Sequence, residues 1–269
     1  MTSLAILSFL FLTLSFVSLW IRRDLKVWGA LLGLSLFCAF LNGNVSWIGL
    51  TIVASLTALW FSYAKKPSLP LFLLLVIASI CFKLRLFPGF QAVFITPKFH
   101  VRWEGAIIGL LPLALVVPLA RTPHDWKNVM KGLVIGCAGI GLLAILATIG
   151  KVTQWDFKLP SFMATRVWSN LFLTSIPEEG FYRGFLQKGL SHYFHNTKKG
   201  KIAALLITSV IFTLAHIYWS PNVAVLGFVF LASLLYGGVY LISGKIESAI
   251  LCHFLLNIIH MTFFEYHAM

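Results

Sequence analysis

Residues 175–185 read "SIPEEGFYRGF", which places two glutamates and an arginine inside an apolar part of the chain. The protein has 269 residues, of which 59% are hydrophobic and 11% are charged, and its mean hydropathy is +0.90. An ionisable group within a membrane span costs about 3 kcal/mol even on lenient scales, so it usually faces a protein interior or a water-filled cavity. The stretch therefore predicts a helix packed inside a membrane bundle.

Apolar runs joined by short loops recur on both sides of this stretch. We predict an all-α fold, a polytopic transmembrane helical bundle of about eight to ten spans. The candidate spans are 3–21, 27–42, 47–64, 69–84, 103–120, 128–149, 162–187, 202–217, 222–243 and 246–264. Pro88 and Gly89 break "LFPGFQAVFI" (86–95), which we expect to be re-entrant or interfacial rather than a span.

The net charge of +13 indicates membrane orientation rather than nucleic-acid binding. Lys and Arg lie in loops between the spans, as the positive-inside rule predicts, and do not gather in one patch. We expect a multi-pass protein of the bacterial inner (cytoplasmic) membrane, with the lipid bilayer as a partner and no nucleic acid. The sequence "RRDLK" follows the first span directly, a pattern typical of a retained anchor.

The chain divides into two regions by the placement of its polar residues. Residues 1–160 are predicted transmembrane helices without a recognised motif, whereas ionisable groups enter the spans of residues 161–269. Four cysteines stand singly in apolar runs and are interpreted as small core or lipid-facing residues: Cys38, Cys81, Cys137 and Cys252.

The first polar cluster is the opening stretch itself. Glu179 and Arg183 are four residues apart, so on an α-helix they share a face and can pair. Glu178 points about 100° away, which leaves it available as a general base. The alternative is a structural ion-pair network that fixes helix packing.

Two further clusters follow on later helices. Phe212 and His216 are four residues apart, as are His253 and Asn257, so each pair shares one helix face. An imidazole and an amide that point together can stabilise an oxyanion. The alternatives are a histidine that only packs and a polar seam that joins two helices by hydrogen bonds.

These three motifs, Glu178-Glu179-x-x-x-Arg183, Phe212-x-x-x-His216 and His253-x-x-x-Asn257, together resemble the CAAX-protease and bacteriocin-processing (CPBP, or abortive-infection) family of glutamic-type intramembrane endopeptidases. The likeness covers about residues 160–260. It implies a helical bundle around a water-accessible cavity and hydrolysis of a peptide bond in a membrane-associated protein or peptide. In eukaryotic relatives that reaction removes a C-terminal tripeptide after prenylation.

The resemblance also implies roles for single residues. Glu178 and His216 would activate a water molecule, and His253 and Asn257 would stabilise the oxyanion. The implied supporting residues are Glu179, Arg183 and Phe212.

Several alternatives stay open from the sequence. Glu178, His216 and His253 would suit a catalytic zinc site, although we favour a mechanism without a metal or other cofactor because Asn257 is a poor zinc ligand. A proton-coupled transporter would also place Glu and His inside spans, and an inactive scaffold could keep the same fold. The loop charges place residues 188–201 in the cytoplasm and therefore His216 toward the outer end of its span. Eukaryotic relatives cut cytosolic tails, so the side of the membrane to which the cavity opens is also undecided.

Overall fold

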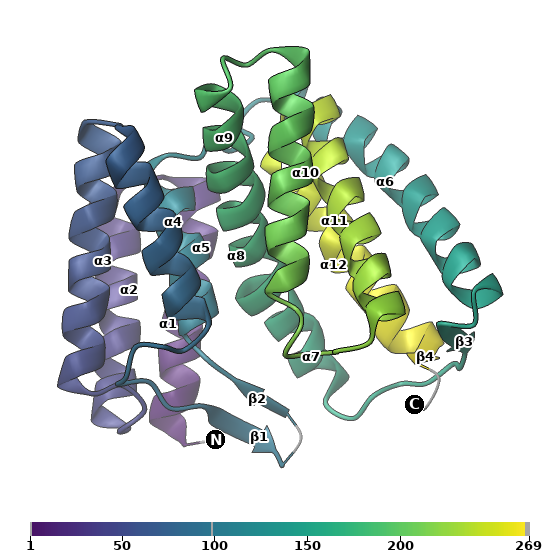
Figure 1. Cartoon of the computed structure of the whole chain (residues 1–269). Helices are drawn as coiled ribbons and strands as arrows, with labels where there is room; N and C mark the ends of the chain where they lie inside the picture. Colours follow the sequence, from purple (N-terminus) through teal and green to yellow (C-terminus); the bar gives the residue numbers. More distant parts are fainter. Residues whose placement is uncertain (1, 98, 267–269) are drawn as a thin grey trace. The chain divides into compact units, whose positions relative to one another are not determined.

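The computed structural model describes residues 2–97 and 99–266, so the last three residues of the predicted second region lie outside it. It confirms the all-α fold (Figure 1). The α-helices are α1 (Ser3–Ile21), α2 (Leu25–Leu41), α3 (Trp47–Lys65), α4 (Leu69–Lys83), α5 (Glu104–Leu115), α6 (Pro123–Ile149), α7 (Met163–Ser169), α8 (Ile176–Glu179), α9 (Lys188–Tyr193), α10 (Lys198–Leu214), α11 (Val223–Ser243) and α12 (Ile246–Phe263).

Two π-helical stretches and four short strands complete the described elements. The π-helices are η1 (Asn170–Ser175) and η2 (Gly180–Gln187), and the strands are β1 (Val93–Thr96), β2 (Phe99–Val101), β3 (Thr153–Trp155) and β4 (Phe264–Tyr266). β1 pairs with β2 and β3 with β4, both antiparallel. The broken stretch 86–95 contains the first three residues of β1 and no helix, as its Pro and Gly predict.

Helix length and composition support a membrane protein. Among the described residues, five helices are long and apolar enough to cross a bilayer, namely α1, α3, α6, α11 and α12, and α2, α4 and α5 are shorter apolar helices. Large apolar side chains on α6 are exposed, for example Val134 and Ile149, which are 68% and 73% exposed. Such a surface is stable in lipid rather than in water, so the predicted transmembrane bundle is confirmed.

The chain forms two compact units, which we describe separately. Unit 1 is Met1–Val117 with Phe172–Phe181, and unit 2 is Pro118–Leu171 with Tyr182–Met269. The division after residue 160 was predicted from the positions of the polar motifs in the sequence. The two units are instead defined by which residues contact one another in the structure. As a result α6 belongs with the helices that carry the histidines, and the short segment that carries Glu178 belongs with α1–α5.

In unit 1, aromatic residues pack around the start of α5. Trp103 is fully buried, stacks on Phe9 with 4.3 Å between ring centroids, and donates from Nε1 to Ser8 Oγ at 3.0 Å. Glu104 is also buried and pairs with Arg102. Glu104 is the first residue of α5, so this helix begins inside the packed unit with its acidic side chain buried.

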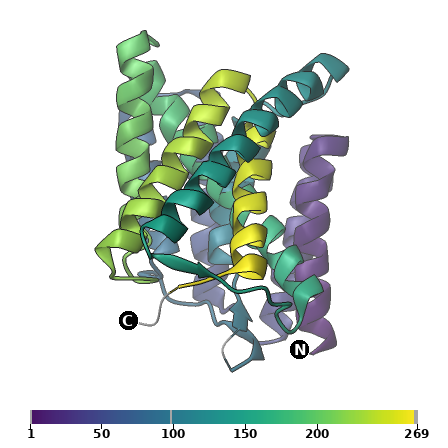
Figure 2. The ribbon, with the colours of Figure 1, turned by 90° about the vertical axis from the view of Figure 1, so that its right-hand side faces the viewer.

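In unit 2, α6, α10, α11 and α12 lie side by side (Figure 2). Small residues let α6 approach α12 closely: a Cβ on Gly132 would lie 2.7 Å from Ser248 Oγ, and one on Gly136 would lie 2.8 Å from Cys252 Sγ. Such small-residue contacts are how helices associate where no hydrophobic effect drives them together. They fix the face of α12 that is turned toward α6.

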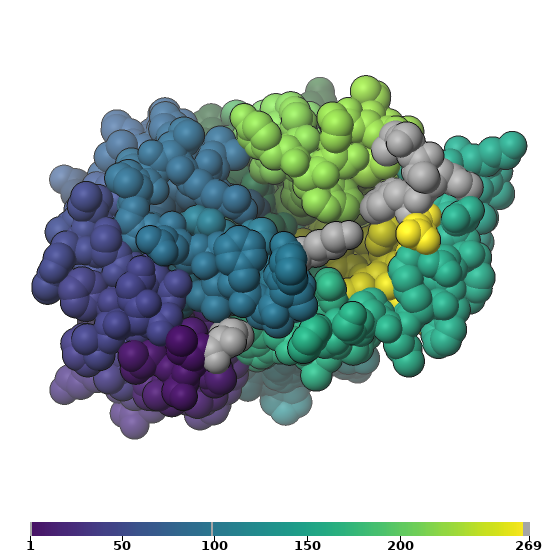
Figure 3. Space-filling model, turned by 90° about the horizontal axis from the view of Figure 1, so that it is seen from below, coloured from purple at the N-terminus to yellow at the C-terminus, as the bar shows by residue number. Residues whose placement is uncertain are grey.

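Aromatic side chains are exposed in the two loops of unit 2 that reach the face seen in Figure 3. Trp155 and Phe157, after α6, are 64% and 60% exposed, and Tyr218 and Trp219, after α10, are 89% and 57% exposed. Tyr and Trp prefer the boundary between lipid and water. We therefore expect this end of unit 2 to lie at a membrane surface.

Candidate active site

Glu178 and Glu179 lie on α8, a single α-helical turn between the two π-helices η1 and η2. Pro177 has no N–H, so the carbonyl of Leu173 lacks its α-helical donor, and the backbone adopts the wider i→i+5 pattern before it. π-Helical segments are rare and occur frequently at functional sites.

This helix geometry changes one argument from sequence spacing. Arg183 lies inside η2, where hydrogen bonds run from i to i+5. The shared face of Glu179 and Arg183 assumed 3.6 residues per turn, so that geometric argument does not hold across Gly180–Gln187. Their pairing stays a prediction.

Close backbone packing fixes α8 against α5. A Cβ on Gly109 would overlap the Cα and carbonyl oxygen of Pro177, and a Cβ on Gly180 would lie 2.7 Å from Leu113 Cγ. Only glycine allows backbones to approach so closely. The carboxylates therefore stand on a segment whose position α5 determines.

Glu178 has a partner that the sequence analysis missed. Lys83 Nζ donates to Glu178 Oε1 at 2.7 Å, and the two side chains are 22% and 14% exposed. The pair joins residues 95 positions apart, so no local spacing could reveal it. The sequence analysis paired only Glu179 with a cation, and it did not identify Lys83 as a counter-charge for Glu178.

In unit 2, His216 lies just beyond the end of α10 and is half-buried. Its ring packs on Phe212, with centroids 4.5 Å apart, and its Nδ1 lies 2.7 Å from the Phe212 carbonyl oxygen. Because that oxygen can only accept, Nδ1 carries the proton, which leaves Nε2 of a neutral ring as an acceptor. An acceptor nitrogen is what activation of water requires.

His253 on α12 is buried, with 4% exposure. It stacks on Tyr236 with centroids 4.6 Å apart and an interplanar angle of 12°, and the Phe212 ring lies 6.0 Å away. Two aromatic neighbours thus fix the plane of the imidazole. Asn257 follows one turn later on α12 and is half-buried.

Phe212 is the centre of this cluster. Besides the two imidazoles, it contacts Arg183, whose guanidinium carbon lies 5.3 Å from the ring centroid. Arg183 is fully buried and donates from Nη2 to Ser233 Oγ at 2.8 Å. Unit 2 therefore brings together Arg183, Phe212, His216 and His253, all of which the sequence predicted, and Tyr236, which it did not.

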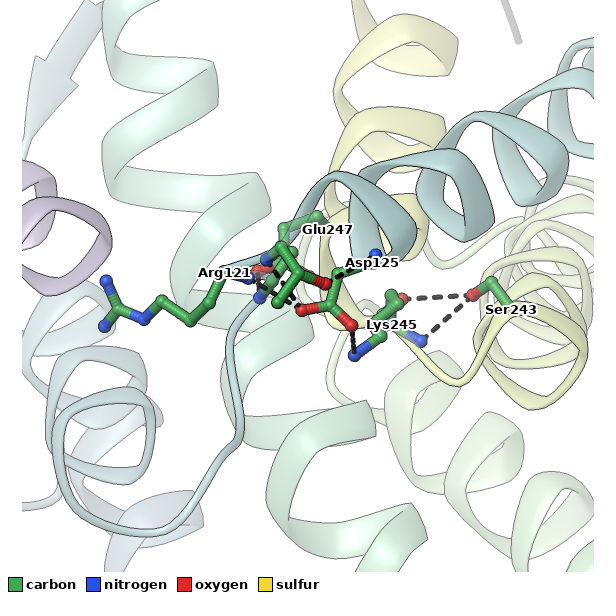
Figure 4. A network of polar contacts seen from close by, with 7 residues as sticks. Arg121, Asp125, Ser243, Lys245 and Glu247 are labelled. Atoms are coloured by element: carbon green, nitrogen blue, oxygen red, sulfur yellow. Dashed lines mark hydrogen bonds and ion pairs between the residues drawn. The ribbon is translucent and has the colours of Figure 1, made fainter.

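A second polar network holds the start of α12 (Figure 4). Glu247 Oε1 accepts from the backbone N–H of Ala120 at 2.7 Å, and Lys245 Nζ pairs with Asp125 at 2.5 Å. Thr122 and Asp125 also form a capping box on α6. Glu247 is 4% exposed, so its carboxylate is buried although it lies in the first turn of α12. The network joins α6 to the helix that carries His253.

Convergence of the carboxylate and the imidazoles on one site stays a prediction, because Glu178 belongs to unit 1 and both histidines to unit 2. Within the described ranges 2–97 and 99–266, no three His, Cys, Asp or Glu side chains gather as metal ligands would. The zinc alternative, whose ligands Glu178, His216 and His253 come from both units, stays a prediction, and we derive no step through zinc.

The helices and the buried polar residues define a membrane protein with groups suited to hydrolysis. Residues 160–259 match the model of the family described as Type II CAAX prenyl endopeptidase Rce1-like. This match confirms the resemblance inferred from the motifs. No curated protein and no solved structure matches the chain.

Proposed function

We propose that the protein is an intramembrane endopeptidase that hydrolyses a peptide bond of a membrane-associated protein or peptide, in the manner of CAAX proteases. The observation that carries this proposal is the Rce1-like match over residues 160–259, which contains all three polar motifs. The exposed apolar helices and the aromatic loops of unit 2 favour a substrate that is itself held in the membrane.

In the proposed mechanism, Glu178 and His216 hold a water molecule and Glu178 accepts one of its protons. The resulting hydroxide attacks the scissile carbonyl carbon, and the carbonyl π electrons move onto oxygen. Donors on His253 and Asn257 would stabilise that oxyanion. When the tetrahedral intermediate collapses, the C–N bond breaks and the proton held by Glu178 passes to the leaving amine.

The arrangement in unit 2 supports these roles in two respects. The Phe212 carbonyl oxygen favours the tautomer of His216 in which Nε2 is an acceptor, and stacking on Tyr236 limits rotation of His253. Preorganised groups contribute most to catalysis because they need not reorient when charge develops. Glu179, Arg183 and Phe212 are proposed as supporting residues.

The proposed setting is the bacterial inner membrane, with no nucleic acid as a partner. Metal dependence is tested by metal analysis of the purified protein and by activity in excess chelator. Stoichiometric zinc with full loss of activity would favour the zinc alternative; full activity without bound metal would favour the metal-free mechanism.

The direct test uses the full chain in proteoliposomes with a prenylated CAAX reporter peptide. We expect Glu178→Gln and His216→Ala each to lower kcat by at least about a hundredfold while the protein still folds and inserts. Glu265→Gln is a matched control, because Glu265 has a 56% exposed side chain and should leave the rate unchanged. Cleavage that survives in both variants would disprove the proposal, and an ion flux that needs Glu178 without proteolysis would favour a transporter.

A further inference from the structure

We propose that one end of unit 1 binds the headgroups of acidic phospholipids through a surface formed by Arg85, Leu86, Phe94, His100 and Arg102. We call these residues the hairpin surface, because they lie between α4 and α5, on and beside the strands β1 and β2 (Figure 1). The inference goes beyond the proposed function, and it assigns an interaction to a part of the chain outside the Rce1-like stretch.

The hairpin surface concentrates positive charge. Burial and the nearby guanidinium groups of Arg85 and Arg102 lower the pKa of His100, so both cations act on the same place. Glu104 acts in the opposite direction, but this carboxylate is buried and paired with Arg102. Arg85 is exposed and forms no ion pair within the part of the chain that the structure describes. Its charge is therefore available to an anion outside the protein.

The backbone conformation of Arg85 is unusual for a residue with a side chain. The N–H of Leu86 donates to the Cys81 carbonyl oxygen at 3.0 Å, and this bond closes a Schellman motif at the end of α4. Arg85 occupies the left-handed position of that motif, with a φ of 62°, where glycine is normally favoured. A side chain in this conformation costs free energy, and such residues cluster at functional sites. The exposed guanidinium is what a glycine here would lack.

The segment that carries the hairpin surface is held in place by the loop after α2. The N–H of Ser46 donates to the carbonyl oxygen of Gly89 at 2.9 Å. The N–H of Gln91 donates to the carbonyl oxygen of Asn44 at 2.8 Å. Gly89 has a φ of 101°, and a Cβ on it would lie 2.5 Å from the backbone nitrogen of Gly49. The charged groups therefore stand on a fixed backbone, which reduces the entropy lost when a ligand binds.

Exposed apolar side chains beside the charges favour a lipid over a soluble anion. Leu86 and Phe94 are 67% and 61% exposed, and the centroids of the Phe94 and His100 rings lie 5.4 Å apart. The preceding helix α4 also exposes apolar residues, for example Ile77 at 60%. At a membrane surface, apolar side chains enter the acyl region while cations contact the anionic headgroups. The hairpin surface presents both kinds of group together.

The test measures how phosphatidylglycerol and phosphatidylcholine bind to the full chain in uncharged detergent micelles. Both lipids carry the same fluorescent acyl chain, so that only the headgroup differs, and anisotropy gives the two dissociation constants. We expect the wild type to prefer phosphatidylglycerol. Arg85→Gln should lower that preference about fivefold, the effect of one cation at a membrane surface, and leave phosphatidylcholine binding unchanged. Arg85→Lys keeps the charge and should retain most of the preference.

Two further variants make the test specific. Arg22→Gln is a matched control, because Arg22 is also an exposed arginine that follows an apolar helix of unit 1, but it pairs with Asp24. It should leave the preference little changed. Arg85→Gly removes the charge but suits the left-handed backbone, so it should raise the melting temperature and still lose the preference. If the glutamine variant fails to fold, the glycine variant decides the question.

Three results would overturn the inference. The first is a wild type without preference for phosphatidylglycerol, and the second is a full preference in folded Arg85→Gln or Arg85→Gly. The third is binding of a soluble glutamate-rich peptide as tightly as the lipid, with loss in Arg85→Gln, since the surface would then fit an acidic peptide. None of these results concerns the proposed function, which is tested separately by cleavage in the Glu178→Gln variant.

Discussion

The carboxylate region of unit 1 and the imidazole region of unit 2 hold their polar groups by different means. Glu178 is held by a charge from a distant helix and by backbone packing of α8 on a glycine. His216 and His253 are held by ring contacts and by a backbone carbonyl. The difference teaches that an acid in a membrane bundle needs a counter-charge, whereas a neutral imidazole needs only a fixed plane.

The substitution Gly109→Ala should have the largest effect, and it tests whether backbone packing holds the carboxylate region of unit 1. The added methyl group would overlap the Pro177 backbone, which cannot move as a side-chain end can. We expect a loss of stability of about 3 kcal/mol and, where the protein still folds, a fall in kcat of about a hundredfold, because a displacement of about 1 Å has such an effect. Thermal unfolding in detergent and reporter cleavage measure the two effects.

Gly105→Ala is the control on the same helix. Its Cβ would lie 3.6 Å from the Leu173 carbonyl oxygen, an ordinary contact, so stability and activity should change little. Equal effects of the two alanine substitutions would show that backbone packing does not position α8.

The substitution Glu247→Ala tests the imidazole region of unit 2, because Glu247 holds the start of the helix that carries His253. It removes the acceptor of the buried Ala120 N–H and should lower the free energy of unfolding by about 1 to 3 kcal/mol, the cost of an unsatisfied buried donor. We expect a lower melting temperature and a smaller kcat, since α12 carries His253.

Glu247→Gln sharpens this test, because the amide keeps an acceptor oxygen and should lose less stability than alanine. Equal losses of stability in the two variants would show that the hydrogen bond from Ala120 to Glu247 does not stabilise unit 2.

The smallest expected effect concerns the loop after α6, outside the spans. The hydrogen bond from Lys158 lowers the pKa of Asp156, and that interaction raises the pKa of Lys158. A lowered carboxylate pKa contributes stability that is present above the unfolded value and is lost as the pH falls through the folded value. Trp155 fluorescence should therefore change only in acid, below the usual range of Asp.

Asp156→Asn should abolish that acid transition and leave cleavage at pH 7 unchanged. Both side chains are more than a third exposed, so the pair adds little to stability. A large loss of activity in this variant would instead link the loop to the site.

The sequence predicted the parts of the molecule that follow from local spacing and hydropathy. The helical bundle follows from apolar runs, and the contact of Phe212 with His216 follows from four-residue spacing on an α-helix. The same reasoning selected His253, because a polar group inside a span needs a partner.

What the sequence could not supply depends on tertiary contacts. Lys83 resembles any lysine at the end of a span, and nothing local indicates that it meets Glu178. The burial of Glu104 and Glu247 likewise reflects packing that apolar composition does not encode. The π-helices were missed for another reason: Pro177 signals a break, but not the form that the backbone takes around it.

The segment Phe172–Phe181 also determines how the Rce1-like stretch could be transplanted. It lies inside residues 160–259 yet folds against helices from the first part of the chain. A graft of residues 160–259 onto a foreign membrane anchor would carry every motif residue but leave Glu178 without Gly109 beneath its helix and without Lys83. The part of the chain that holds Glu178 in place is therefore larger than the stretch that the family model matches.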